Sequence, residues 1–241
     1  MWYKVNKIRV GTQQVRPSWW TPWSNTLFYL PLESDTTDHS WRNIATNPSN
    51  ITYWTLWGVN CAIANGSSSI ITFNEILSSW LTEWTVSVLL YKNYEDTSSD
   101  DYKNILYYRV TNMWFVWIDS EYNWWWLNYR RIWWYVANRW NAYITSNLSY
   151  RWHHLLFTFN NSVAKYYIDG NKISEEASST SRVWWYWEWT WWNTRSIFKW
   201  NPSANSYWKW WAREIIFEKK MWSESDIVKY FNKIKSQYWI S

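Results

Sequence analysis

Short apolar runs, rich in β-branched, aromatic and leucine residues, alternate with polar turn residues along most of the chain. Runs of this kind predict strands. Asp169-Gly170-Asn171 separates two of them and predicts a tight hairpin turn. The predicted strands are Thr26–Leu30, Ala62–Ala64, Ser69–Phe73, Thr85–Lys92, Asn104–Val110, Phe115–Asp119, Leu127–Ile132, Tyr143–Thr145, Trp152–Asn160, Ala164–Asp169, Asn171–Ser174, Thr194–Lys199 and Arg213–Lys219. Many short strands predict an all-β fold, a sandwich or jelly roll of two antiparallel sheets.

A helical pattern is found close to the C-terminus. Ser223 and Asp226 have the spacing of a capping box, with a hydroxyl at the N-cap and an acid three residues later. Apolar side chains then recur at helical spacing, at Ile227, Tyr230, Phe231 and Ile234. The sequence therefore predicts a short C-terminal helix that docks on the edge of the sandwich.

The chain divides into three predicted parts. Residues 1–16 are predicted to form a short β-hairpin segment around Gly11-Thr12, and residues 17–25 a flexible linker. Residues 26–241 form the predicted jelly-roll domain. The start of the chain lacks the apolar core of a signal peptide, and no apolar run is long enough to span a membrane. We therefore expect no membrane insertion.

Tryptophan and glycine are present in unusual numbers. The 241 residues include 30 Trp and only 4 Gly, whereas Gly is ordinarily about 7% of a chain. Many Trp lie in stretches typical of turns, where Gly, Asn and Asp are favoured: Asn123–Trp126, Ile132–Tyr135, Arg139–Asn141 and His39–Asn43. We hypothesise that most of these positions are glycines encoded by UGA in a lineage, bacterial or phage, that uses an alternative genetic code. The alternative is a genuinely Trp-dense protein whose exposed rings stack on sugars.

Four segments together resemble the laminin-G-like, concanavalin A-like lectin and glucanase jelly rolls. They are Leu27–Asn43, Glu83–Leu90, Tyr150–Gly170 and Trp211–Ile227, in the family's order. The resemblance covers residues 26–240 and implies a jelly-roll fold. It also divides the tryptophans into two groups, according to the type of residue that the family carries at each position. Those where the family carries large apolar residues are Trp84, Trp152 and Trp222; those where it carries glycine are Trp41, Trp124–Trp126, Trp184, Trp185, Trp191 and Trp192.

Catalytic patterns are missing from the sequence. Glycosidases of this fold carry alternating carboxylates on one strand, but Glu175 and Glu176 are adjacent and Glu188 is isolated. No Gly-x-Ser-x-Gly elbow is present. His153 and His154 are neighbours that face opposite ways on a strand, so we interpret them as structural. We therefore expect no enzymatic activity.

Calcium is the one cofactor that the resemblance implies, because some family members bind Ca²⁺ with oxygens of the opening turn and closing strand. The matching candidates here are Asp38, Asn43 and Glu214. Arg213 stands where the family often has Asp, so an Arg213–Asp38 ion pair is one alternative, and a turn capped by Asp38 is another. The expectation is no cofactor, or one structural Ca²⁺. The single cysteine, Cys61, excludes an internal disulfide and a cysteine zinc site.

The net charge of +5 is scattered in pairs such as Arg130-Arg131, and the chain has no nucleic-acid motif. We predict a non-catalytic, lectin-like module that binds carbohydrate or a surface glycoprotein. Aromatic and planar polar groups in the central strands are the candidate ligand contacts: Tyr107, Arg109, Asp119, Tyr129 and Arg131.

Two alternatives stay open. One is a structural or adhesive component of a phage tail, fibre or cell surface, whose jelly roll contacts virion or other proteins. The second is a glycoside hydrolase of the same fold. The predicted location is extracellular, on a cell surface or in a virion.

Overall fold

The computed structural model describes residues 25–74, 76, 82–91, 103–109, 115–122, 130–136, 139–144, 151–160, 163–177, 195–198 and 211–238. The predicted N-terminal hairpin segment, the linker up to residue 24 and the Trp-rich stretch at 183–192 lie outside these residues. For the strands between residues 103 and 144, the description concerns the backbone and its pairing. None of the described helices is long and apolar enough to cross a membrane.

Within the described residues, the strands form two antiparallel sheets. The eight-stranded sheet has the order β13-β12-β11-β6-β15-β4-β3, and β1 also pairs with β15. Its strands are β1 (Thr26–Leu30), β3 (Thr52–Leu56), β4 (Val59–Ile63), β6 (Glu83–Tyr91), β11 (Trp152–Asn160), β12 (Val163–Ile168), β13 (Asn171–Ala177) and β15 (Trp211–Glu218). The first and last strands of the domain are therefore neighbours.

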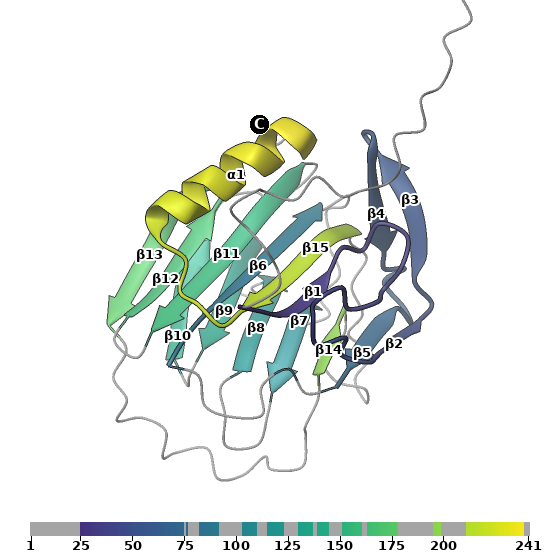
Figure 1. The fold of residues 1–241 in the computed structure, drawn as a ribbon, viewed down its shortest axis with the longest axis horizontal. Helices are drawn as coiled ribbons and strands as arrows, with labels where there is room; N and C mark the ends of the chain where they lie inside the picture. The colour runs from purple at the N-terminus through teal and green to yellow at the C-terminus, as the bar shows by residue number, and fades with distance from the viewer. Residues whose placement is uncertain are drawn as a thin grey trace, which may run out of the picture.

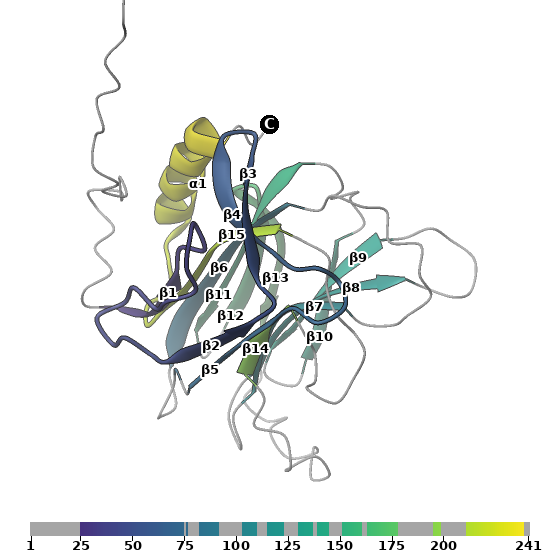
Figure 2. The ribbon, with the colours of Figure 1, turned by 90° about the vertical axis from the view of Figure 1, so that its right-hand side faces the viewer.

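The seven-stranded sheet has the order β10-β9-β8-β7-β14-β5-β2. Its strands are β2 (Thr46–Ser49), β5 (Ile70–Phe73), β7 (Lys103–Arg109), β8 (Phe115–Tyr122), β9 (Arg130–Val136), β10 (Arg139–Ile144) and β14 (Arg195–Ile197). It lies on the side of the eight-stranded sheet opposite the C-terminal helix, as Figure 2 shows for β7, β8 and β9.

Apolar side chains bury both faces of the eight-stranded sheet. Val88, Leu155 and Ile215 belong to the core cluster on its inner face, together with Ile71 and Ile197 of the seven-stranded sheet. A second cluster on the outer face joins strand residues to the helix α1 (Glu224–Tyr238). Figure 1 shows α1 lying across this outer face. Two buried faces explain why the burial along β6 and β11 is nearly continuous instead of alternating.

The helix begins as its sequence predicts. The backbone N–H of Asp226 donates to Ser223 Oγ at 3.2 Å, and the backbone N–H of Ser223 donates to Asp226 Oδ2 at 3.3 Å, which completes the capping box. Ile227, Tyr230 and Ile234 are buried against the sheet. The predicted helix and its apolar face are confirmed.

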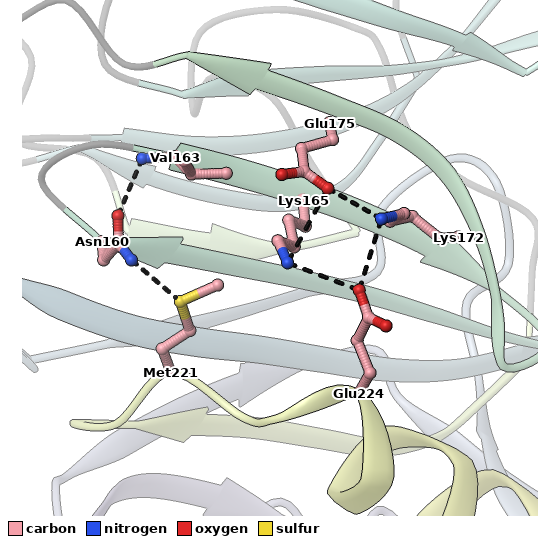
Figure 3. A network of polar contacts seen from close by, with 7 residues as sticks. All are labelled: Asn160, Val163, Lys165, Lys172, Glu175, Met221 and Glu224. Atoms are coloured by element: carbon pink, nitrogen blue, oxygen red, sulfur yellow. Dashed lines mark hydrogen bonds and ion pairs between the residues drawn. The ribbon is translucent and has the colours of Figure 1, made fainter.

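Charged side chains also connect the start of α1 to the β12–β13 hairpin (Figure 3). Glu224 Oε1 lies 3.4 Å from Lys165 Nζ and 3.3 Å from Lys172 Nζ. Lys172 Nζ lies 2.7 Å from Glu175 Oε2 as well. These groups are largely solvated, so the cluster contributes orientation of the helix more than stability.

Some predicted boundaries were wrong. The sequence prediction missed β2 and β3, and it placed turns at Trp133, Trp134 and Trp140, which lie in β9 and β10. Aromatic and β-branched residues favour strands. The neighbours of these Trp residues favour a strand, but the prediction treated the Trp positions as turn residues and so missed the strand there.

The predicted hairpin turn after β12 is confirmed, and it also seats the helix. Asp169 and Gly170 have φ values of 49° and 75°, as in a two-residue type I′ turn. A Cβ atom at Gly170 would lie only 2.6 Å from Cδ1 of Phe231 on α1. The glycine is thus required both by the turn and by the close approach of the helix.

We predict that Gly170→Ala destabilises the domain by about 2–3 kcal/mol, because it adds this clash to the cost of a left-handed residue. The matched control is Gly58→Ala. Gly58 has a similar φ of 79° but nothing within 4 Å of its added Cβ, so only about 1 kcal/mol should be lost. Urea unfolding measures both; equal losses would contradict the packing of Phe231 on Gly170.

Candidate functional site

The pairing register of the seven-stranded sheet assigns the predicted ligand contacts to one face. Ile71 and Ile197 belong to the core, and Ile197 pairs with Leu106 of β7. Successive residues of a strand lie on opposite faces, so the register assigns Tyr107 and Arg109 to the outer face, the same face as Ser196, which pairs with Tyr107 and is itself buried.

The neighbouring strands continue this face. Tyr107 pairs with Trp117, which puts Asp119, two residues further along β8, on the outer face. Glu121 follows on the same face and pairs with Arg131 of β9. The register thus brings four of the five predicted residues onto one face, whereas Tyr129 lies outside the described residues.

Sequence reasoning missed other outer-face positions. Tyr135 pairs with Trp117, and Tyr143 of β10 pairs with Trp133. Glu121 lies directly opposite Arg131 in the register of β8 and β9. Arg131, Trp133 and Tyr135 are spaced two residues apart, which is the spacing of residues on one face of a strand. The prediction of a turn at residues 132–135 caused this pattern to be missed.

The opening turn has a different organisation, centred on Asp38. Its Oδ1 accepts hydrogen bonds from the backbone N–H groups of Tyr29 and Ser40, both at 2.9 Å. Its Oδ2 accepts from Ser40 Oγ at 2.8 Å and from the backbone N–H of Ile44 at 2.6 Å. Both carboxylate oxygens therefore satisfy protein donors. Asn43, with a left-handed φ of 47°, completes the turn.

A second polar cluster is formed by the closing strand. A register shift between Ala212 and Glu214 marks a β-bulge, which allows the adjacent Arg213 and Glu214 both to be buried. Arg213 forms an ion pair with Glu33 and donates to the backbone carbonyl of Pro31. Its guanidinium also lies 5.4 Å from the ring centroid of Tyr238. Arg213 thus pairs with Glu33 and not, as one alternative held, with Asp38.

Two of the predicted calcium ligands, Asp38 and Glu214, accept hydrogen bonds from different protein groups. Glu214 Oε2 accepts a hydrogen bond from Tyr29 Oη at 3.1 Å, and burial together with Glu214 raises the pKa of Tyr29. Asp38 instead binds the backbone of the opening turn. Among the residues that the structure describes, no group of three or more His, Cys, Asp or Glu side chains is placed to hold a metal. The observed hydrogen bonds favour the turn-capping interpretation of Asp38, and calcium stays a prediction.

The two histidines of β11 are buried and have separate partners. His153 Nδ1 lies 2.8 Å from Asp169 Oδ2, and the Arg151 Nε–H donates to His153 Nε2 at 3.1 Å. His154 Nε2 lies 2.8 Å from Ser87 Oγ on the helix side of the sheet. Desolvation by burial lowers the pKa of His154 to about 4, despite an opposing influence of Asp169. Both side chains are fully buried, which agrees with a structural role.

Several solved structures have a fold similar to that of this chain. The receptor binding domain of botulinum neurotoxin C/D mosaic serotype is similar with a TM-score of 0.63 and 18% identity, over 86% of this chain and 51% of that chain. The binding domain of Paraclostridial Mosquitocidal Protein 1 is similar with a TM-score of 0.63 and 16% sequence identity, over 87% of this chain and 52% of that chain. The binding domain of botulinum neurotoxin DC in complex with rat synaptotagmin II is similar with a TM-score of 0.59 and 15% sequence identity, over 87% of this chain and 52% of that chain.

These similarities confirm the predicted fold class. The chain is a concanavalin A-like jelly-roll sandwich, and it spans about half the length of the structures it matches. Those structures are described as binding domains. No protein-family model matches the sequence, and no curated protein matches it.

We predict that Asp38→Asn lowers the free energy of unfolding by about 2 kcal/mol or more, because an amide places N–H groups against buried donors. The control, Asp35→Asn, changes an exposed carboxylate that accepts from the backbone N–H of Thr37 and should cost less than about 1 kcal/mol. Urea unfolding with and without CaCl₂ measures both. Stabilisation by calcium that disappears in Asp38→Asn would contradict the turn-capping role.

We also predict a loss of stability in mild acid that depends on His154. Its pKa is about 4 in the folded chain and about 6.5 when unfolded, so the unfolded state binds the proton more readily. Its contribution is complete above pH 6.5 and decreases by about 3 kcal/mol as the pH falls to 4. His154→Gln should reduce this dependence in urea unfolding at several pH values. An unchanged pH dependence in the variant would overturn the assignment.

Proposed function

We propose that the chain is a non-catalytic, lectin-like module that recognises cell-surface carbohydrate through the outer face of the seven-stranded sheet. The observation that carries this proposal is the register, which gathers Tyr107, Arg109, Asp119 and Arg131 on one face. Aromatic rings and planar polar groups are the groups that bind sugar rings and hydroxyls. The helix covers the outer face of the other sheet.

The binding role of the similar structures supports a module of this kind. One of them was solved in complex with rat synaptotagmin II, so a protein receptor is the main alternative to a glycan. The second alternative is an adhesive component of a phage tail, fibre or cell surface, in which the jelly roll contacts virion proteins. In each case we propose a location outside the cell or in a virion.

We predict that the full chain binds members of a glycan array. Arg109→Ala should weaken binding about tenfold, because a charge-assisted hydrogen bond is worth about 1.5–3 kcal/mol. The control is Lys229→Ala, an exposed cation on α1, which should leave binding unchanged. Binding to virion or deglycosylated surface proteins, with no glycan bound, would instead support a protein-contact role. Hydrolysis of a β-glucan would contradict a non-catalytic module.

The described tryptophans fall into different environments. Trp84, Trp152 and Trp222 are buried, as the family resemblance implies. Trp57 is 72% exposed and has a φ of 53°, directly before Gly58 in the turn that joins β3 to β4. Trp41 is also exposed. A bulky residue with positive φ is strained, whereas glycine is favoured at both central positions of a type I′ turn.

We propose further that Trp57, Trp41 and other Trp positions in turns carry glycine in the natural protein, through a UGA codon read as glycine. This proposal limits which aromatic positions belong to a binding surface. The strained turn at Trp57 supports it, together with the excess of Trp over Gly.

Two measurements test this decoding. The gene should show UGA at codon 57 and UGG at codons 84 and 152. Trp57→Gly should stabilise the domain by about 1 kcal/mol, because it removes the cost of a left-handed bulky residue. The control is Trp54→Gly in β3, which should destabilise because glycine weakens a strand. A UGG codon at position 57, or a loss of stability in Trp57→Gly, would refute the proposal.

A further inference from the structure

The strands at the ends of the two sheets differ in how their edges are protected. Among the described strands, the end positions are held by β13, β3, β10 and β2. Register shifts interrupt the pairing of β13 with β12 and of β10 with β9, and β2 contains Pro48, which has no N–H to donate. Bulges and prolines at an edge prevent it from pairing with another chain. The side of β1 away from β15 is occupied by the opening turn, through backbone hydrogen bonds of Tyr29 to Asp38 and His39.

The edge of β3, in contrast, is regular and uncharged. Its five residues pair with β4 without a register shift, from Thr52 opposite Ile63 to Leu56 opposite Val59. In the part of the chain that the structure describes, β4 is its one partner strand, and Figure 1 shows β3 and β13 at opposite ends of the sheet. Residues 43–74 contain no Asp, Glu, Lys or Arg, so β3 also lacks the charges that commonly guard an edge.

The turn after β3 identifies which of its backbone groups face outward. Residues 57 and 58 form a two-residue turn with φ values of 53° and 79°, and such a turn closes on a hydrogen-bonded pair, here Leu56 and Val59. Hydrogen-bonded pairs alternate with non-hydrogen-bonded pairs along an antiparallel ladder. The N–H and C=O groups of Tyr53 and Thr55 therefore point away from β4, where another strand can pair with them.

We propose that β3 pairs with β3 of a second copy of this chain, antiparallel about a two-fold axis beside Trp54. In this register Tyr53 of one copy forms a hydrogen-bonded pair with Thr55 of the other, twice by symmetry. The chain carries a net charge of +5, which opposes contact between copies through its charged surfaces, whereas the uncharged β3 edge brings no like charges together. These backbone pairs do not depend on how the Trp54 codon is read.

The pairing has a consequence for the orientation of the two copies. Trp54 lies opposite Cys61, which belongs to the outer-face cluster, so the two Trp54 side chains meet on the outer face of a continuous sheet. Both α1 helices then lie on that side, and both seven-stranded sheets lie on the other. The dimer thus presents two modules in the same direction, and two linked modules bind a multivalent surface more tightly than one. Dimer formation does not depend on which ligand the modules bind.

Sedimentation equilibrium of the full chain tests the dimer. We expect a reversible monomer–dimer equilibrium with a Kd on the order of 10 μM, as suits a small interface. Thr55→Pro removes an outward-facing N–H in both copies and should weaken the dimer about tenfold or more. The matched control, Thr55→Val, retains the N–H and, like the proline variant, loses the side-chain hydrogen bond to Asn60 Oδ1. It should leave the Kd unchanged.

A charge swap tests the two-fold register. Trp54→Lys and Trp54→Glu each place like charges opposite one another in the homodimer, so each variant alone should be monomeric. An equimolar mixture of the two variants should dimerise again, because the opposite charges then face each other. Recovery in the mixture also shows that neither variant is monomeric through a folding defect.

The other outcomes overturn the proposal. A chain that stays monomeric at about 100 μM, ten times the expected Kd, has no such dimer. If Thr55→Pro then raises hydrogen exchange in residues 1–16, the edge belongs to the N-terminal segment instead. A dimer that persists in Thr55→Pro and in both Trp54 variants forms through another surface.

Discussion

Burial of both faces of the eight-stranded sheet is the constraint on which the rest of the structure depends. Its inner face packs on the seven-stranded sheet, and its outer face packs on α1 through residues such as Leu156, Ile216 and Ile227. At about 25 cal/mol for each Å² of apolar surface, these two layers supply the main driving force for folding. Because α1 covers the outer face of the eight-stranded sheet, we propose the outer face of the seven-stranded sheet as the surface for a ligand.

The join between the first and last strands closes the domain. β1 pairs with β15, so residues almost two hundred positions apart must meet, which is a slow, non-local step in folding. Asp38 satisfies the backbone of the opening turn, and the bulged Arg213 forms its ion pair with Glu33 beneath Tyr238. Buried charges are tolerated only when they are paired. These polar contacts therefore specify how the ends meet, and they engage both carboxylate oxygens of Asp38, one of the predicted calcium ligands.

The sequence predicts the parts that depend on local chemistry. The capping box at Ser223 and the turn at Asp169-Gly170 follow from residue type and spacing. The burial of Trp84, Trp152 and Trp222 follows from the family resemblance. The register of the outer face does not, because pairing is set by contacts between distant strands. For this reason Tyr135 and Glu121 were missed, and Glu33 was not among the partners considered for Arg213. The Trp-rich stretches added a further error, since strand residues around Trp133 were interpreted as a turn.

The central claim is that ligand binds on the outer face of the seven-stranded sheet. Hydrogen–deuterium exchange of the full chain, with and without the tightest-binding glycan, tests it most directly because amide protection reports the site without mutation. The account predicts new protection in β7, β8 and β9 and unchanged exchange in α1 and β3. Protection confined to α1, or to the β3–β4 hairpin, would contradict it.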